Sequence, residues 1–239
     1  NSVSVSNTTE FDISDSVLLK NIFGYRHLKS ANRFDFDGTP VTLVGSEEYQ
    51  ESRQYSNELQ LQAQLFNRSV DFIAGLFYFR ENGDNRQVTN GRASGGVIRN
   101  TSYAAFAQAT WHTPFVPGLS LTAGGRITRD DRYYDAQNFA PGGACRIPVD
   151  DATPTIVLSP CSLINEASFT EPTWTFTADY KISPGMLVYA NYRRGYRSGG
   201  FTLAGTRRAE FEPFRPETVD DIEVGAKMDV DFLGGPMRV

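Results

Sequence analysis

Five arginines lie at positions from which they can bind an anion. Arg126 and Arg193 share the polar face of their predicted strands, and Arg129, Arg132 and Arg197 lie toward the ends of strands where long connections begin. A guanidinium forms charge-assisted hydrogen bonds with carboxylate or phosphate oxygens, so this group would attract an anionic substrate. These five residues are the first candidates for substrate contact.

A second interpretation assigns some of the same arginines to the internal structure. Asp221 and Glu223 lie on the polar face of the strand that follows Arg193 and Arg197. Opposite charges on neighbouring antiparallel strands pair across the hairpin. We favour this ion-pair network over substrate binding, and both interpretations remain open at this point.

Aromatic residues near the same arginines add a second kind of contact. Tyr133 and Tyr134 follow Arg132, and Phe139 comes shortly after them, in a segment that we expect to be a long loop. They are candidates for an aromatic patch that captures substrate. The same rings are equally consistent with packing that loop against its neighbours.

Two cysteines, Cys145 and Cys161, lie in one segment rich in Pro, Gly and Asp. A disulfide between them would close a loop of about 15 residues and contribute roughly 3 kcal/mol of stability. Such a bond points to an oxidising compartment. The alternative is two unlinked thiols, and the spacing fits neither a redox CxxC motif nor a zinc site.

Other chemistry is poorly supported. The two histidines, His27 and His112, lie far apart without carboxylates at ligand spacing, so we expect no metal, no cofactor and no enzyme. The acidic pairs at 130–131 and 150–151 are interpreted as turn-capping residues. A net charge of −5 without a dense Lys/Arg cluster makes nucleic-acid binding unlikely.

These candidates must be positioned by strands, because the hydrophobic pattern alternates with period two. In residues 173–182, Thr173, Thr175 and Thr177 alternate with Trp174 and Phe176. The same alternation covers 55–65, 119–127 and 221–232, whereas both faces of 71–80 are apolar. The alternating segments of about ten residues suit tilted strands that cross a bilayer, which need about 9–11 residues.

Turn signals divide the chain into roughly ten strands. Tight connections are predicted near 12–15, 67–69, 114–118, 183–185 and 234–236. Longer loops are predicted at 30–51, 80–100, 130–167 and 199–216. Short turns that alternate with long loops are typical of a membrane barrel, whereas a soluble sandwich should show less ordered loop lengths. The sequence therefore predicts an all-β, antiparallel up-and-down transmembrane β-barrel.

Four motifs, in order, resemble the barrel of the TonB-dependent receptors of bacterial outer membranes. They are RQYSNELQL with VDFIAGLFYFR (53–61 and 70–80), SYAAFAQATWH with LSLTAGGRIT (102–112 and 119–128), the YxxYxxGYxSGGF pattern of 189–201, and RPETxxxxEVG at 215–225. Two positions depart from the family pattern: Gln60 replaces an Arg, and Ile127 replaces a Tyr.

The resemblance implies a barrel of roughly 22 strands that is filled by an N-terminal plug. We expect residues 1–239 to form about half of such a barrel, with the plug and the TonB-contacting segment outside this sequence. The expected partners are outer-membrane lipid, the TonB complex through regions elsewhere in the protein, and a small-molecule substrate.

The function that the resemblance implies is energised uptake of a scarce nutrient across the outer membrane. The first expectation is a ferric siderophore, with vitamin B12, an oligosaccharide or an aromatic compound as alternatives. A passive porin or a β-barrel adhesin would show the same strand pattern, and a soluble carbohydrate-binding sandwich is a third possibility.

Overall fold

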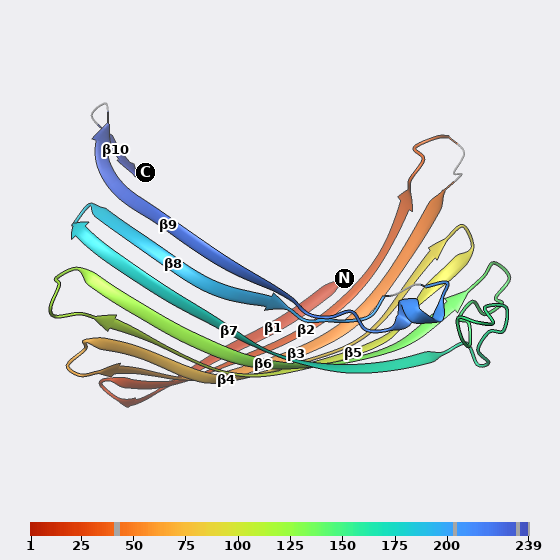
Figure 1. Cartoon of the computed structure of the whole chain (residues 1–239), viewed down its shortest axis with the longest axis horizontal. Helices are drawn as coiled ribbons and strands as arrows, with labels where there is room; N and C mark the ends of the chain where they lie inside the picture. The colour runs from red at the N-terminus through yellow and green to blue at the C-terminus, as the bar shows by residue number, and fades with distance from the viewer. Residues whose placement is uncertain (41–43, 203–204, 233–234, 239) are drawn as a thin grey trace.

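The computed structural model describes residues 1–40, 44–202, 205–232 and 235–238, and they form one antiparallel sheet with a single short helix (Figure 1). The strands are β1 (Ser2–Ser14), β2 (Val17–Asp35), β3 (Gly45–Leu65), β4 (Val70–Thr89), β5 (Arg92–His112), β6 (Leu119–Phe139), β7 (Leu163–Ser183), β8 (Met186–Arg197), β9 (Glu217–Phe232) and β10 (Gly235–Arg238). The 3₁₀ helix η1 (Arg208–Phe211) lies between β8 and β9. None of the helical structure in these ranges is long and apolar enough to cross a membrane.

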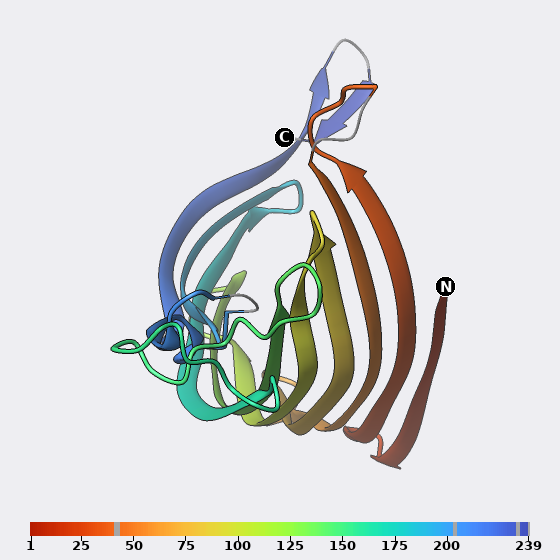
Figure 2. The same cartoon turned by 90° about the vertical axis from the view of Figure 1, so that its right-hand side faces the viewer.

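Every strand pairs with its neighbours in the sequence, in the order β1 to β10. The pairing is antiparallel throughout, which confirms the predicted up-and-down meander of about ten strands. The sheet is open and strongly curved, and forms a trough (Figures 1 and 2). Its shape is that of one sector of a barrel wall.

The strands are longer than the facing pattern predicted. Five of them, β3 to β7, contain 20 or 21 residues each. The long connections predicted at 30–51 and 130–167 are therefore wrong in extent: β2 continues to Asp35 and β6 continues to Phe139. Both faces of these strand extensions are largely polar, so they lack the alternation of apolar and polar residues that predicts a strand.

The loop predicted at 80–100 does not exist. β4 runs to Thr89, β5 starts at Arg92, and a two-residue turn joins them. Asn90 and Gly91 have φ values of 49° and 76°, the positive values that a type I′ hairpin turn requires. Asn-Gly is a strong hairpin signal, but no apolar alternation flanks it here, so the hydrophobic pattern alone predicts a loop.

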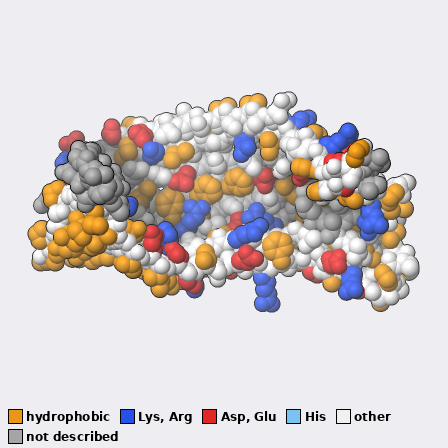
Figure 3. All heavy atoms as spheres, turned by 90° about the horizontal axis from the view of Figure 1, so that it is seen from above, with side chains coloured by type: hydrophobic (Ala, Val, Ile, Leu, Met, Phe, Trp, Pro, Cys, Tyr) orange, Lys and Arg blue, Asp and Glu red, His pale blue; other side chains and the backbone are white. Residues whose placement is uncertain are grey.

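The two faces of the sheet differ as predicted. Leu59, Leu76 and Ile127 share the convex face and leave 40%, 62% and 47% of their surfaces exposed. Phe176 and Ile222 continue this exposed apolar surface on β7 and β9. The concave face has basic and acidic side chains gathered along its middle (Figure 3). Large exposed apolar surface is expected on a barrel wall that faces lipid.

Two segments at one end of the trough lie inside the curve of the sheet (Figure 2). The Cys loop comprises residues 140–162 between β6 and β7, and the strap comprises the described residues between β8 and β9, namely 198–202 and 205–216. Residues 41–43, 203–204 and 234 of the predicted connections lie outside the described residues. The β4–β5 turn and the described part of the β2–β3 connection lie at the same end, and the described connections at the opposite end are short turns.

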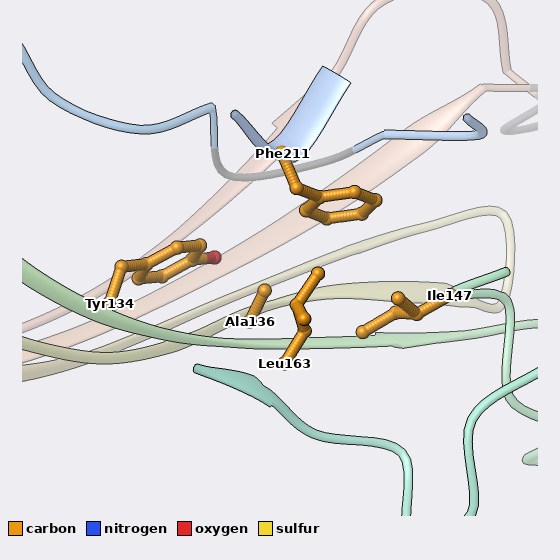
Figure 4. Packing of buried hydrophobic residues seen from close by; sticks show 5 residues of the cluster. All are labelled: Tyr134, Ala136, Ile147, Leu163 and Phe211. Atoms are coloured by element: carbon orange, nitrogen blue, oxygen red, sulfur yellow. The ribbon is translucent and has the colours of Figure 1, made fainter. Parts of the chain in front are cut away.

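A small apolar core joins these segments to the sheet (Figure 4). Tyr134 and Ala136 of β6, Leu163 of β7, Ile147 of the Cys loop and Phe211 of η1 are all buried. The predicted disulfide between the two cysteines is present at the edge of this core, with a Cα–Cα distance of 5.4 Å. The strap end of the trough is therefore held by packing as well as by strand pairing.

Candidate substrate-binding face of the trough

The middle of the concave face forms a hollow of about 470 Å³, and Arg126 and Arg193 both line it. Gly124 and Thr175, also in its lining, present small groups, which leaves the space open. Glu58 contributes a carboxylate to the same wall. Arginine donors, a carboxylate and hydroxyls in one hollow can bind a polar ligand through several hydrogen bonds.

Arg126 is held in place by aromatic rings. Its guanidinium carbon lies 5.0 Å from the ring centre of Phe77 and 5.8 Å from that of Phe106, and its Nε donates to Thr128 Oγ1 at 3.0 Å. Cation–π contact orients the group without neutralising it. Within the described ranges no carboxylate lies within the 4.0 Å of an ion pair with Arg126. Its remaining N–H groups are available to an anion.

Arg193 is neutralised by its neighbours. Its Nε donates to Asp221 at 2.6 Å, and its terminal nitrogen donates to Glu223 at 3.1 Å. The hydroxyl of Tyr189 also donates to Glu223, at 2.9 Å. The ion-pair interpretation is therefore correct for Arg193, whereas Arg197 lies opposite Glu217 in the register and not beside Asp221 or Glu223.

Between the hollow and the strap end of the trough, a buried carboxylate joins the strap to the sheet. Asp130 of β6, whose side chain is 5% exposed, accepts hydrogen bonds from the hydroxyls of Ser102 and Tyr196 and from the guanidinium of Arg132. Arg132 also donates through Nε to Ser198 Oγ at 3.2 Å. A buried carboxylate is tolerated only when it is paired and hydrogen-bonded in this way. Arg132 thus connects the strap with β6.

The Cys loop contributes a second fastening. Asp151 accepts the backbone N–H groups of Arg208 and Ala209, the first residues of η1, at 2.6 and 3.2 Å. Its neighbour Asp150 accepts the N–H and the hydroxyl of Thr153, and these bonds lower the pKa of the Asp150 carboxyl. Asp150 caps a turn as predicted, whereas Asp151 joins two segments.

Glu210 stabilises the fold of the strap itself. Its carboxylate accepts the N–H groups of Thr206 and Arg207, at 2.5 and 3.2 Å. Hydrogen bonds from these two backbone groups hold the pKa of Glu210 below its usual value. The ionised form of Glu210 therefore belongs to the ordered strap.

The remaining candidates from the sequence lie on different faces of β6. Arg129 and Tyr133 alternate with Arg126, Arg132 and Tyr134 along β6 and lie on the convex face, away from the hollow. Tyr134 is 2% exposed and donates its hydroxyl to the Gly95 carbonyl oxygen at 2.8 Å, so it packs the strap end of the trough. Its ring offers no surface to a substrate in this arrangement.

Three important residues were missed or misread in the sequence. The prediction that the pair at 130–131 caps a turn is wrong, because the pair lies within β6, with Asp130 buried and Asp131 bonded to Arg129 and Ser168 on the other face. Asp151 was likewise grouped with turn caps, and Phe211 had no neighbouring signal. Their partners come from other strands or loops, which period-two reasoning does not locate.

This arrangement defines a class of protein: a meander of long strands with an apolar convex face and a polar, arginine-lined concave face is a sector of a transmembrane β-barrel. Residues 1–236 match the family described as "TonB dependent receptor-like, beta-barrel". The chain belongs to this family, which confirms the predicted family, fold class and outer-membrane location.

Solved structures show the same fold. The ferric yersiniabactin uptake receptor FyuA of Yersinia pestis is similar over 96% of this chain, with a TM-score of 0.77 and 16% identity, and the matched region is 33% of FyuA. The ferric-catecholate import receptor Fiu of E. coli is similar over 96% of this chain and 38% of its own, with a TM-score of 0.66 and 16% identity. The copper transporter OprC is similar over 96% of this chain and 38% of its own, with a TM-score of 0.66 and 12% identity. The chain thus spans about a third of the length of these proteins, which are receptors and transporters.

Proposed function

We propose that this chain forms part of the barrel of an outer-membrane receptor that takes up a scarce nutrient, most specifically an anionic ferric siderophore. The observation that supports this substrate class is Arg126, a cation without an ion-pair partner among the described residues, in the wall of the central hollow. Arg193, beside it, already has two carboxylate partners. A ligand with negative oxygens would therefore bind first to Arg126.

The aromatic rings under Arg126 also suit this substrate class. Phe77 and Phe106 present ring surface beside the guanidinium, so a ligand that combines planar groups with negative oxygens would contact both. The receptors FyuA and Fiu, which share the fold, are described as taking up iron bound to yersiniabactin and to catecholates. OprC, which also shares it, is described as a copper transporter.

The proposal includes energy coupling and a plug. We place both in parts of the protein beyond residues 1–239, with the TonB complex as the partner. In this assignment the barrel segment supplies one wall of the substrate path. Binding would be converted into transport by movement of the plug.

Uptake of labelled ferric chelates by iron-starved cells tests the proposal. Cells that lack the gene should lose uptake of at least one anionic ferric siderophore, and loss of TonB should abolish the same uptake. Arg126→Gln should raise the concentration needed for half-maximal uptake by about tenfold, the loss expected for one or two charge-assisted hydrogen bonds. Arg126→Lys should restore part of the affinity, because the charge remains but the planar fork is lost.

Arg68→Gln, in the β3–β4 turn at the far end of the trough, is the matched control and should leave uptake unchanged. Uptake that survives the loss of TonB would instead support a passive porin. Uptake of copper or of an uncharged nutrient, unaffected by Arg126→Gln, would contradict the anionic substrate.

A further inference from the structure

The convex face has a band of tyrosines in four adjacent strands. The rings of Tyr25 and Tyr55 lie 5.0 Å apart, and those of Tyr78 and Tyr103 lie 5.4 Å apart. Tyr25 pairs with Tyr55, and Tyr78 pairs with Tyr103, in the strand register. Tyrosine collects where the apolar core of a bilayer meets its headgroups. This band therefore marks the interface on the strap side of the membrane.

Basic residues occupy the next positions of the same face, toward the strap. Two residues beyond the tyrosines of β2, β3 and β4 come His27, Arg53 and Arg80, and Arg129 of β6 pairs with Tyr103. The β5 residue in this row is Thr101. From β2 to β5 the row contains no acidic residue, and Asp131 of β6 pairs with Thr101.

The carboxylates of the neighbouring rows neutralise only part of this charge. The carboxylate oxygens of Glu51 lie 3.0 Å from the side-chain nitrogens of His27 and Lys29 and 3.7 Å from that of Arg53. Asp131 Oδ1 lies 3.1 Å from Arg129 Nε. Farther from the tyrosines, Asp84 stands opposite Glu51, and Asp135 stands opposite Val97.

Two exposed arginines between these pairs remain uncompensated. Arg80 has no carboxylate within ion-pair distance in the described part of the chain, and the same is true of Arg99 on the adjacent strand. Arg99 contacts the ring of Tyr133 at 4.8 Å instead. Like charges on adjacent strands repel each other, so an anion between Arg53, Arg80 and Arg99 would relieve that repulsion.

An apolar groove lies directly below these cations. It has a volume of about 630 Å³, and Leu59, Leu76, Ala105 and Ile127 line it, with Tyr78, Tyr103 and Arg129 at its upper edge. Ala105 stands between Leu76 and Ile127 in the register, and its small side chain opens the groove between the two larger ones. The groove lies on the convex face, and its volume can hold a stretch of hydrocarbon chain.

The long connections of outer-membrane barrels lie on the extracellular side, which is here the strap end. We propose that this face binds one membrane lipid with a phosphorylated headgroup in the outer leaflet. Arg53, Arg80 and Arg99 hold the phosphate, and an acyl chain lies in the groove over Ala105. The proposal depends on two independent features: the arginines without ion-pair partners and the apolar groove. They lie on opposite sides of the tyrosine band, where headgroups and acyl chains of a lipid would lie. Arg194 on β8 is also cationic and faces outward, but Asp220 already neutralises it at 2.6 Å, so the site is centred on β3 to β6.

Native mass spectrometry of the purified full-length receptor tests this assignment. The probes are a bis-phosphorylated lipid A, the same lipid without phosphates, and inorganic phosphate. The phosphorylated lipid should bind at least about tenfold more tightly than the dephosphorylated one, and Arg80→Gln/Arg99→Gln should remove this preference. Ala105→Phe, which fills the groove, should weaken binding of the phosphorylated lipid while the arginines remain in place.

The control is Arg68→Gln/Arg92→Gln, two arginines at turns outside the site, which should bind like the wild type. Equal binding of both lipids, or unchanged binding by the double arginine variant, would overturn the proposal. Binding of inorganic phosphate that displaces the lipid, or no effect of Ala105→Phe, would show an anion site without a lipid chain and would also overturn it. Melting temperatures of all variants without lipid identify any that fail to fold, and for those Arg80→Lys/Arg99→Lys, which keeps the charge and should retain the preference, replaces the glutamine pair.

Discussion

Asp151 and Arg208, 57 residues apart in the sequence, are joined by a hydrogen bond of 2.6 Å from the backbone N–H of Arg208 to the Asp151 carboxylate. This bond ties the Cys loop to the strap at the start of η1. Carboxylates that accept the first N–H groups of a helical turn contribute about 1 kcal/mol. Because of this bond, the ordered conformation of the Cys loop and that of the strap stabilise each other.

Asp151→Ala should therefore loosen the strap without unfolding the barrel. We expect trypsin to cleave after Arg207 or Arg208 several-fold faster, roughly tenfold if the full contribution of about 1–2 kcal/mol is lost. Asp150→Ala is the matched control, because Asp150 bonds only to the turn at Thr153 within its own loop in the described contacts. Equal cleavage rates in the two variants would show that the Asp151 bond does not hold the strap.

Phe211→Ala should release the strap more completely. The ring is 1% exposed and packs on Tyr134 and its neighbours, and removing such a ring costs about 3 kcal/mol or more. Hydrogen exchange of the strap amides should accelerate by roughly a hundredfold, while β3 to β5 stay protected. Phe214→Ala, where the ring is 48% exposed, should have a much smaller effect.

Acid should weaken the strap through Glu210. The pKa of this carboxyl is lowered in the folded strap, so its contribution is fully present above the unfolded value of 4.5 and is lost as the pH falls below 4.5 toward the lowered pKa. Hydrogen exchange in the strap, corrected for the intrinsic pH dependence, should rise relative to that in β4 between about pH 6 and about pH 3. Glu210→Gln should remove most of this dependence, and a wild-type profile in that variant would contradict the assignment.

The disulfide should be detectable in intact cells. Cys145 and Cys161 should resist alkylation until a reductant is added, and reduction should lower the stability of the Cys loop by about 3 kcal/mol or less. A Cys145→Ser/Cys161→Ser variant should then show the same exchange rates with and without reductant. Rapid labelling of untreated cells would exclude the bond under those conditions.

Local periodicity was sufficient to predict the membrane-facing half of β3, β6, β7 and β9, but not that of β4, where both faces are apolar. The alternation of Thr173, Trp174, Thr175 and Phe176 gave the correct faces, because one face meets lipid and the other is polar. It failed beyond the tyrosine band, where both faces meet water and only the Asn90–Gly91 dipeptide signalled the hairpin.

The candidate site was predictable only in part, for a related reason. The faces of Arg126 and Arg193 follow from their strands, and so does the pairing of Arg193 with Asp221. The roles of Asp130 and Phe211 depend on where the strap folds. That path is determined by tertiary contacts between segments far apart in the sequence, which local patterns in a single sequence do not reveal.

The length of β3 to β7 determines what an outer-membrane receptor of this kind shows to its surroundings. A strand of 21 residues rises about 70 Å, roughly twice what a tilted strand needs to cross a bilayer. Much of the region outside the lipid is therefore paired sheet, with side chains fixed in the register of their neighbours. An antibody or phage that recognises it must read residues from several strands at once, so isolated peptides from this part of the chain will be poor immunogens against the native protein.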